Sequence, residues 1–437
     1  MAVELITIFM FVTMMILLVT GLPIAFCLGA VGIIFAFFLW GPNALGLVSK
    51  NMFGMMTELT LIAIPLFVFM AYMLEHSGIG ENLYDAMYKW LGPLKGGLAM
   101  GTVFICAVIA AMSGLSATGT LSMGVVSAPA MLKRGYNKNI ALGCILAGGA
   151  LGALIPPSVP MIVYCLLAGI SVGQLFLSGI LPGLLLTFLF VAYIGIRSYA
   201  QPHMGPALPL GERASWREKF ISLRMVILPV ILIIAVLGSI FAGVATPTEA
   251  AAVGAMGSII CAAINRRITW DRIKLTAYGT LRITGMLMWI MAAASVFTAV
   301  FTGLGATQLI SETVRSLHVS PIGVIIGMQA TIFVLGMIMD PNGIMLITVP
   351  IYAPIAAGLG FDPVWFGLLT IMNIECAYLT PPFGWNIFYL RSVAPPGVTL
   401  ADIYKSIPVF VVLQLMGFIL VLLFPVIALW LPRLIIR

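Results

Sequence analysis

Apolar segments about 20 residues long follow one another along nearly the whole chain. Residues 4–20, 22–40 and 226–243 are examples. A helix of this length spans the hydrocarbon core of a bilayer, where every backbone polar group must be satisfied internally. Only 8% of the 437 residues are charged and 62% are hydrophobic, whereas soluble proteins carry about 25% charge. The sequence therefore predicts an all-α integral membrane protein and excludes an ordinary soluble domain.

The positive charges indicate how the chain crosses the membrane. If the N-terminus lies outside, 17 of the 21 Lys and Arg residues fall in segments on the inner side, as the positive-inside rule requires. This distribution places both termini outside. The cations are scattered among loops, so we expect lipid contact and no nucleic-acid partner.

The second half of the chain repeats the first at an offset of 225 residues. Gly80 then aligns with Gly305, and the pair Pro156-Pro157 aligns with Pro381-Pro382. Repeats of this length change the interpretation of the whole fold. The predicted units are a first repeat at 1–200, a polar cytoplasmic linker at 201–224 and a second repeat at 225–437.

Each repeat is predicted to contain about five transmembrane helices, a hairpin with a polar tip and a helix broken by the proline pair. The hairpins are expected at about 97–132 and 321–358, and the broken helices at about 139–168 and 363–392. Each hairpin is either re-entrant or two full crossings; charge does not separate these readings, and the polar tips favour re-entrance. An odd number of crossings inverts the second repeat, as in many secondary transporters.

Further helical segments are expected outside the hairpins and broken helices, among them 175–199 and 247–264. The apolar pattern predicts helices at 55–75, 280–302 and 403–431.

The two proline pairs carry the strongest local chemical signal. Proline inside a helix removes a hydrogen bond and frees carbonyl groups, here around Gly152 and Ala377. At membrane depth these groups need protein, water or an ion as a partner. Two readings remain open, a structural kink and a sodium site built from hard oxygen ligands.

The hairpin tips supply complementary polar groups. The first tip, SGLSATG, offers the hydroxyls of Ser113 and Ser116, and the second, MDPNG, offers Asp340 and Asn342. The second string alone also fits a surface turn. Each arm that follows a tip points a helix N-terminus towards the centre, which favours anions. The predicted substrate contacts flank the tips and breaks: Ser116, Ser158, Thr380 and Asn386.

Two acidic residues lie next to apolar segments and have different explanations. Thr246, Pro247 and Glu249 fit a capping box at a helix start. Glu375 lies inside a helix, where an ionisable group is functional by default. It could tune an ion site, carry a proton or pair with a donor on another helix.

The sequence contains no Walker A, GxGxxG or HExxH string, the motifs of ATP-driven pumps, dinucleotide-binding enzymes and zinc proteases. An intramembrane serine hydrolase using Ser113 is an alternative, but no base for it is evident. We therefore expect that the chain is not an enzyme.

At these residues the chain resembles the large membrane subunit of TRAP (tripartite ATP-independent periplasmic) transporters from end to end. The resemblance is carried by SGLSATG, by the long string ending in ALIPPSVPMIVY, by GVATPTEAAAVGA and by ECAYLTPPFGWNIFYL. It implies an elevator fold of the ion transporter superfamily in the bacterial inner membrane, with sodium-driven uptake of an organic anion such as a keto acid, dicarboxylate or sugar acid. It also implies a separate small four-helix membrane subunit and a periplasmic substrate-binding protein as partners.

The resemblance also implies a first sodium site, and the repeat offset suggests a second. The first would use Ser113, the Leu115 backbone, Gly152, Ile155 and Pro157. Family members commonly have Ser-Gly-Ser where this chain has Ser-Gly-Leu, so the Leu115 side chain cannot coordinate and Ser116 could compensate. The second site would use four residues at the corresponding positions, Asp340, Ala377, Thr380 and Pro382.

The resemblance leaves one alternative of the same superfamily, a stand-alone carboxylate symporter that uses sodium or protons. For movement, we expect both hairpins and both broken helices to travel together. The helices near 4–40 and 226–264 would stay fixed against the small subunit, with 81–90 and 269–279 as connecting arms.

Overall fold

A computed structural model describes residues 3–316 and 319–435, and every regular element within these residues is helical. The all-α prediction is confirmed. The elements of the first half are α1 (Val3–Val19), α2 (Ile24–Trp40), α3 (Ala44–Met56), η1 (Leu59–Ile62), α4 (Ala63–His76), α5 (Ile79–Leu91), α6 (Gly97–Ser113), α7 (Ser116–Lys133), α8 (Lys138–Ala150), η2 (Leu151–Ala153), α9 (Val159–Ala168) and α10 (Val172–Ala200).

Two short helices, η3 (Pro202–Met204) and η4 (Leu210–Glu212), lie between the halves. The second half contains α11 (Trp216–Phe241), α12 (Pro247–Ile264), α13 (Trp270–Gly303), α14 (Ala306–Ser316), α15 (Pro321–Gly336), α16 (Pro341–Gly358), α17 (Pro363–Ala377), α18 (Trp385–Val393), α19 (Leu400–Ser406), α20 (Pro408–Leu423) and α21 (Val426–Ile435).

The order of elements follows the repeat seen in the sequence. The hairpin α6–α7 corresponds to α15–α16, and the broken helix α8–α9 corresponds to α17–α18. Helix α8 begins at Lys138 and α17 at Pro363, which keeps the 225-residue offset. Both proline pairs also have a cis peptide bond. Each half therefore places a hairpin directly before a proline-broken helix.

Several helix boundaries differ from the sequence predictions, because the apolar pattern does not show short breaks within an apolar segment. Helix α3 is additional, and the segment expected at 55–75 is divided into η1 and α4. The helix expected at 403–431 is three helices, with Pro408 at the first turn of α20 and Pro425 just before α21. Proline at these points lacks the amide hydrogen that a continuous helix needs.

The polar connection between the halves is shorter than expected. Helix α11 begins at Trp216, so the last part of the predicted 201–224 linker is helical. Ser215 forms a capping box with Glu218 at this start. The rest of the linker lies against the α5–α6 loop and the α7–α8 loop. Gly96 N donates to Gly205 O at 2.8 Å, and Asn137 N donates to Met204 O at 3.0 Å.

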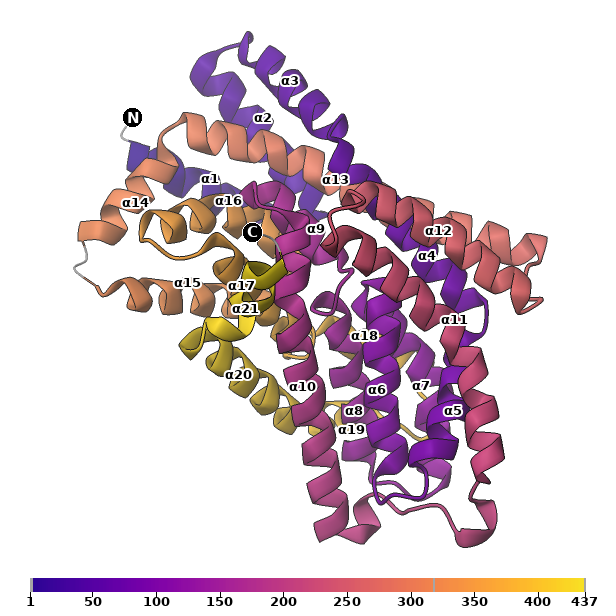
Figure 1. Ribbon diagram of the computed structural model, residues 1–437. Coiled ribbons are helices and arrows are strands. Elements are labelled where there is room, and N and C mark those ends of the chain that lie inside the picture. The colour runs from indigo at the N-terminus through magenta and orange to yellow at the C-terminus, as the bar shows by residue number, and fades with distance from the viewer. Residues whose placement is uncertain (1–2, 317–318, 436–437) are drawn as a thin grey trace.

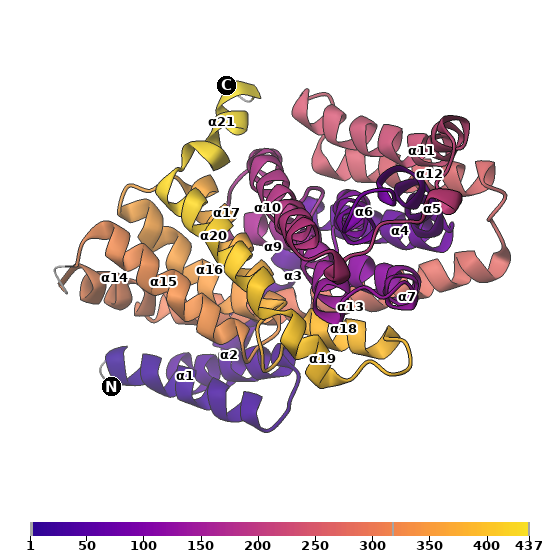
Figure 2. The same cartoon turned by 90° about the horizontal axis from the view of Figure 1, so that it is seen from below.

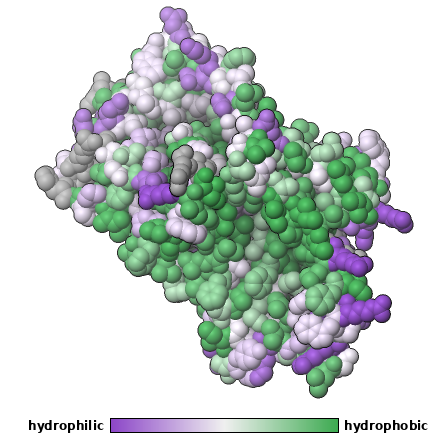
Figure 3. Space-filling view, in the orientation of Figure 1, coloured by the Kyte–Doolittle hydropathy of each residue, from purple (hydrophilic) through white to green (hydrophobic). Residues whose placement is uncertain are grey.

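Six of the described helical segments are long and apolar enough to cross a bilayer, or seven if the bent α11 counts as one span. The first arm of each hairpin is close to the minimum length: α6 has 17 residues and α15 has 16. Figure 3 shows a broad hydrophobic surface across the middle of one face, with hydrophilic residues towards its ends. This surface is the one expected of a protein that contacts lipid.

The outer helices form a group that we call the frame: α2, α4, α11, α12 and α13. Within it α4 packs on α12 and α13, α2 on α13, and α11 on α12. Small residues allow these close approaches, as is common between membrane helices. A Cβ on Gly32 would lie 2.9 Å from the Val296 side chain, and one on Gly257 would lie 2.3 Å from Leu232.

The hairpins and broken helices form a second group, the inner bundle. Helix α9 packs on α16, α18 packs on α7, and α10 contacts α6, α17 and α20. The second part of each broken helix thus contacts the second hairpin arm of the other half. In both views α4, α5, α11 and α12 gather on one side and α14–α16 on the other, with α9, α10 and α17 between them (Figures 1 and 2).

Candidate ion and substrate site

The first hairpin tip and the first helix break are in direct backbone contact. A Cβ on Gly114 would lie 2.2 Å from the Pro157 carbonyl oxygen, and one on Gly152 would lie 2.6 Å from the Leu115 carbonyl oxygen. Val159 N donates to Gly114 O at 3.2 Å. Gly114 also has a φ of 61°, which favours glycine. We call this contact junction 1. It can form only because glycine leaves no side chain between the backbone of the tip and the backbone of the break.

Junction 1 brings together four of the five residues predicted for the first sodium site. Ser113, Gly152 and Pro157 are buried there, and the Ser113 hydroxyl donates to Leu115 O at 3.3 Å. Ile155 lies in the same break, where its side chain packs against Gly183. Hydroxyl and carbonyl oxygens are ligands suited to a hard cation. The residues present therefore fit a sodium ion.

The second tip and break, which we call junction 2, are arranged differently. Asp340 Oδ2 accepts from the amides of Asn342 and Gly343 at 3.0 and 3.1 Å, so it caps α16. The Thr380 hydroxyl, just beyond the end of α17, donates to Cys376 O in the last turn of that helix at 2.7 Å. The contact to the hairpin is made by Ala377, whose Cβ would lie 2.4 Å from a Cβ on Gly336.

Junction 2 is also more open. Pro381, Pro382 and Phe383 are exposed, whereas Pro156, Pro157 and Ser158 are buried. Of the second predicted set, Ala377 and Thr380 are buried, Pro382 is exposed and Asp340 is half-buried. These residues supply a carboxylate, a hydroxyl and carbonyl groups, which also suit a hard cation.

The predicted substrate residues fall into one bonded pair and two separate helix ends. Ser116 Oγ donates to Asn386 Oδ1 at 2.6 Å, and Asn386 Nδ2 donates to Leu146 O at 3.1 Å. Ser158 caps α9 and donates to Ala153 O. The Thr380 hydroxyl bonds the Cys376 carbonyl at the end of α17. The Ser116–Asn386 pair therefore joins hairpin α6–α7 to the other half's broken helix.

Glu375 is fully buried and pairs with another helix. Gln414 Nε2 on α20 donates to Glu375 Oε1 at 3.3 Å, while Glu375 Oε2 and Gln414 Oε1 have no hydrogen-bond partner among the described residues. Of the three roles considered for Glu375, pairing with a helix donor is the one observed. At Glu249, the predicted capping box with Thr246 is confirmed.

Sequence reasoning missed a polar group in the frame, close to the second tip. Tyr72 on α4 lies near enough to Arg282 and Glu75 for electrostatic interaction. Tyr389 on α18 has the same relation to Asp340 and to Tyr72. Arg282 is exposed on a long apolar helix, and that isolated cation was the available signal. Arg391, in the last turn of α18, is exposed and donates to Val398 O at 2.8 Å.

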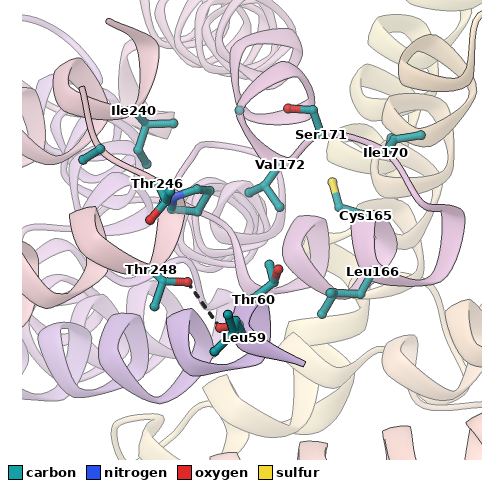
Figure 4. Close-up of a pocket in the computed structure, with 13 residues that line it drawn as sticks. Leu59, Thr60, Cys165, Leu166, Ile170, Ser171, Val172, Ile240, Thr246 and Thr248 are labelled. Carbon is teal, nitrogen blue, oxygen red and sulfur yellow. Dashed lines mark hydrogen bonds between the residues drawn. The ribbon is translucent and has the colours of Figure 1, made fainter. Parts of the chain in front are cut away.

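A separate cavity of about 420 Å³ lies between η1, the α9–α10 connection and the α11–α12 connection. Its hydroxyl groups come from Thr60, Ser171, Thr246 and Thr248 (Figure 4). Thr246 is engaged with Glu249, Ser171 accepts from Gln174 N, and Thr248 donates to Leu59 O at 3.4 Å. No lysine or arginine lines this cavity, so an anion would find no cationic partner there.

The helical architecture is that of solved membrane transporters. The chain is similar to the YdaH transporter of Alcanivorax borkumensis, with a TM-score of 0.61 and 14% identity over 87% of this chain and 88% of that one. It is likewise similar to MtrF of Neisseria gonorrhoeae, described as an antimetabolite efflux pump, with a TM-score of 0.62 and 14% identity over 88% and 84%. At this identity the likeness defines the fold alone, a helical membrane transporter.

The family follows from sequence. Residues 11–427 match the family described as "Tripartite ATP-independent periplasmic transporter, DctM component", and the chain belongs to this family. It is 31% identical to a C4-dicarboxylate TRAP transporter large permease of Vibrio cholerae, over 97% of both chains. It is 33% identical to one of Pseudomonas aeruginosa, over 90% and 91%, and 31% identical to an ectoine TRAP transporter large permease of Halomonas elongata, over 99% and 100%.

Proposed function

We propose that this chain is the large membrane subunit of a transporter that imports a small organic anion together with sodium. The observation that carries the proposal is junction 1, where a hydroxyl and several carbonyl groups meet in a buried setting inside the inner bundle. Relatives are named for C4-dicarboxylates and ectoine, which supports a small carboxylate substrate.

The proposal includes two protein partners and a location. A small four-helix membrane subunit would lie against the frame, and a periplasmic binding protein would deliver the anion. Relatives named as large permease subunits support this division of labour. The chain would be a multi-pass protein of the bacterial inner membrane with both termini periplasmic, as the charge distribution favours.

The substrate's negative charge would be met without a lysine or arginine in either tip. A helix N-terminus carries about half a positive charge, and α7 and α18 both begin at the Ser116–Asn386 pair. Two such termini and the sodium ions would balance one carboxylate. Arg282 of the frame, which interacts electrostatically with Tyr72, is a further candidate for contact with the anion.

Uptake into proteoliposomes tests the coupling and the partners. With the chain, its small subunit and the binding protein present, we expect uptake to require a sodium gradient and to fail under a pH gradient alone. Uptake driven by pH without sodium would contradict sodium coupling. Uptake by this chain alone would favour the stand-alone symporter.

An elevator movement would carry the inner bundle past the frame. Its support is the packing of each broken helix on the other half's hairpin, which joins the four mobile elements into one body. Movement of this kind is common where repeats surround a midplane site. The predicted arms would then be α5 and the first turns of α13.

Two engineered disulfides test the movement. Gly124→Cys with Val393→Cys lies within the bundle, where a Cβ on Gly124 would be 3.9 Å from Val393 Cβ, a suitable disulfide separation. Ile24→Cys with Gly343→Cys joins the frame to the second tip, which are also in contact. Oxidation should leave transport intact in the first pair and stop it, reversibly with reductant, in the second. The opposite pattern would refute the division into bundle and frame.

The hydrolase alternative has less support. The Ser113 hydroxyl bonds the backbone of Leu115, and no histidine, lysine or carboxylate is bonded to it among the described residues. Labelling of Ser113 by a fluorophosphonate would revive this alternative.

A further inference from the structure

A small cavity lies between the frame side of the molecule and the first hairpin, and its lining shares Ser113 with junction 1. It is about 10 Å³ in volume and is lined by side chains of α4, α5, α6 and α7. A cavity of about this size admits one water-sized particle. Its polar lining consists of one carboxylate and three hydroxyl residues: Glu75, Ser113, Thr118 and Ser122.

Helix α7 directs different residues to three neighbours. Ser116 faces α18 through Asn386. Gly119 approaches α8, since its Cβ would lie 3.2 Å from Gly149 Cα. Thr118 and Ser122 are four residues apart and share a face, and a Cβ on Gly80 of α5 would lie 3.8 Å from Ser122 Cβ. The hydroxyls of Thr118 and Ser122 therefore lie where α7 packs against α4 and α5.

The charge of Glu75 has no partner in its surroundings. Glu75 is half-buried, and none of the ion pairs among the described residues includes it. It lies in the last turn of α4, where the helix dipole is itself negative and disfavours a carboxylate. Arg267 approaches Gly78 on the next turn, and Arg282 interacts with Tyr72, yet neither forms an ion pair with Glu75. An unpaired carboxylate in a lipid-embedded protein is costly.

We propose that this cavity is a sodium subsite in which Glu75 supplies the charge and Ser113, Thr118 and Ser122 supply neutral oxygens. Hard oxygen donors of this kind select alkali and alkaline-earth cations over softer metals. The small volume and the single carboxylate favour a monovalent ion that replaces one water molecule. The inference rests on the proposed sodium coupling and adds a site that neither junction contains.

The position of the subsite gives it a specific role. Ser113 lies both at junction 1 and in this cavity, so an ion can pass between the two by exchanging neighbours at one hydroxyl. The carboxylate belongs to the frame and the hydroxyls belong to the inner bundle. The subsite is therefore complete only while the first hairpin lies against α4, and a bound ion stabilises that arrangement.

Direct sodium binding tests the proposal without any transport step. The full chain, purified with its small subunit, is titrated with NaCl against choline chloride while ²²Na⁺ binding and thermal unfolding are followed. Glu75→Gln keeps the size and removes the charge, and Ser122→Ala removes a hydroxyl that only this cavity uses. Glu81→Gln is the matched control, because Glu81 is an exposed glutamate on α5 outside the cavity.

We expect Glu75→Gln to raise the half-saturating sodium concentration about tenfold and Ser122→Ala to raise it by about threefold, because charged hydrogen-bonding partners contribute roughly twice as much as neutral ones. Glu81→Gln should match the wild type. Unchanged sodium affinity in Glu75→Gln, with a sodium-responsive wild type, would overturn the subsite and leave the proposed coupling standing. A wild type that does not respond to sodium would overturn both.

Discussion

Junctions 1 and 2 have the same order of elements and differ in how tightly they close. At junction 1, Gly114 and Gly152 let the backbone of the tip touch the backbone of the break. At junction 2, Asp340 is occupied with capping its own helix, and the exposed break residues leave the region open. The two halves therefore share their helix order, while local residues decide which junction is enclosed.

The difference also separates two kinds of cation environment. Junction 1 has neutral oxygens and is buried, so an ion there must lose most of its water and depends on well-placed carbonyl groups. Junction 2 offers a carboxylate that is half-buried, so charge attraction compensates for looser contacts. We expect substitutions that affect fit to act most strongly at junction 1.

The largest effect should come from closing the space at junction 1. Gly114→Ala places a Cβ against the Pro157 carbonyl, and overpacking with a positive φ should cost about 3 kcal/mol of stability. Gly169→Ala is the matched control, because it has a φ of 67° with open space around it, and should cost about 1 kcal/mol. Thermal unfolding in detergent measures both. Equal losses would show that junction 1 is not tightly packed.

The same change at junction 2 should have a smaller effect. Gly336→Ala brings its methyl group against the Ala377 side chain, where α15 and α17 can shift apart, at a cost of about 1–2 kcal/mol. Thermal unfolding of both variants under the same conditions compares the two stability losses directly. A loss larger than that of Gly114→Ala would reverse the ranking of the two junctions.

The Ser116–Asn386 pair links the two halves and allows a third measurement. Asn386→Ala leaves both Ser116 and the Leu146 carbonyl without their partner, which should cost about 2 kcal/mol, against about 1 kcal/mol for Ser116→Ala. Substrate binding should weaken in both variants. A double-mutant cycle on unfolding gives the coupling, and additive losses would show that the bond contributes nothing.

Replacement of Glu375 should have little effect on coupling. Glu375→Gln keeps an oxygen for Gln414 Nε2, so stability should change by less than about 1 kcal/mol. Sodium-dependent uptake should remain, because neither junction uses this side chain. Loss of coupling in proteoliposomes would instead identify Glu375 as a proton carrier and contradict the proposed use of sodium.

The smallest effect is expected at the polar surface, far from both junctions. Arg134 donates to Glu212 at 2.6 Å and holds the pKa of that carboxyl below its ordinary value of 4.5. A lowered pKa means that the bond stabilises the fold above pH 4.5 and is lost as the pH falls through the lowered value. Glu212→Gln should therefore differ slightly from wild type in melting temperature at pH 7 and converge with it in acid.

Much of this architecture could be predicted from the sequence. Apolar runs gave the helical class because lipid admits few other backbones. The proline pairs located both breaks, and polar tips such as Ser113 and Asp340 marked both hairpins, since these signals act within a few residues along the chain. The capping box at Glu249 was predictable for the same reason.

Only the tertiary structure decided which polar groups meet. That Ser116 bonds Asn386, that Glu375 faces Gln414 and that Glu75 shares a cavity with Ser113 depends on contacts between elements tens to hundreds of residues apart. Sequence periodicity shows which face of a helix is polar, but not which neighbour covers that face. The helices follow from local chemistry, whereas the site follows from the packing of glycine-lined surfaces that brings distant segments together.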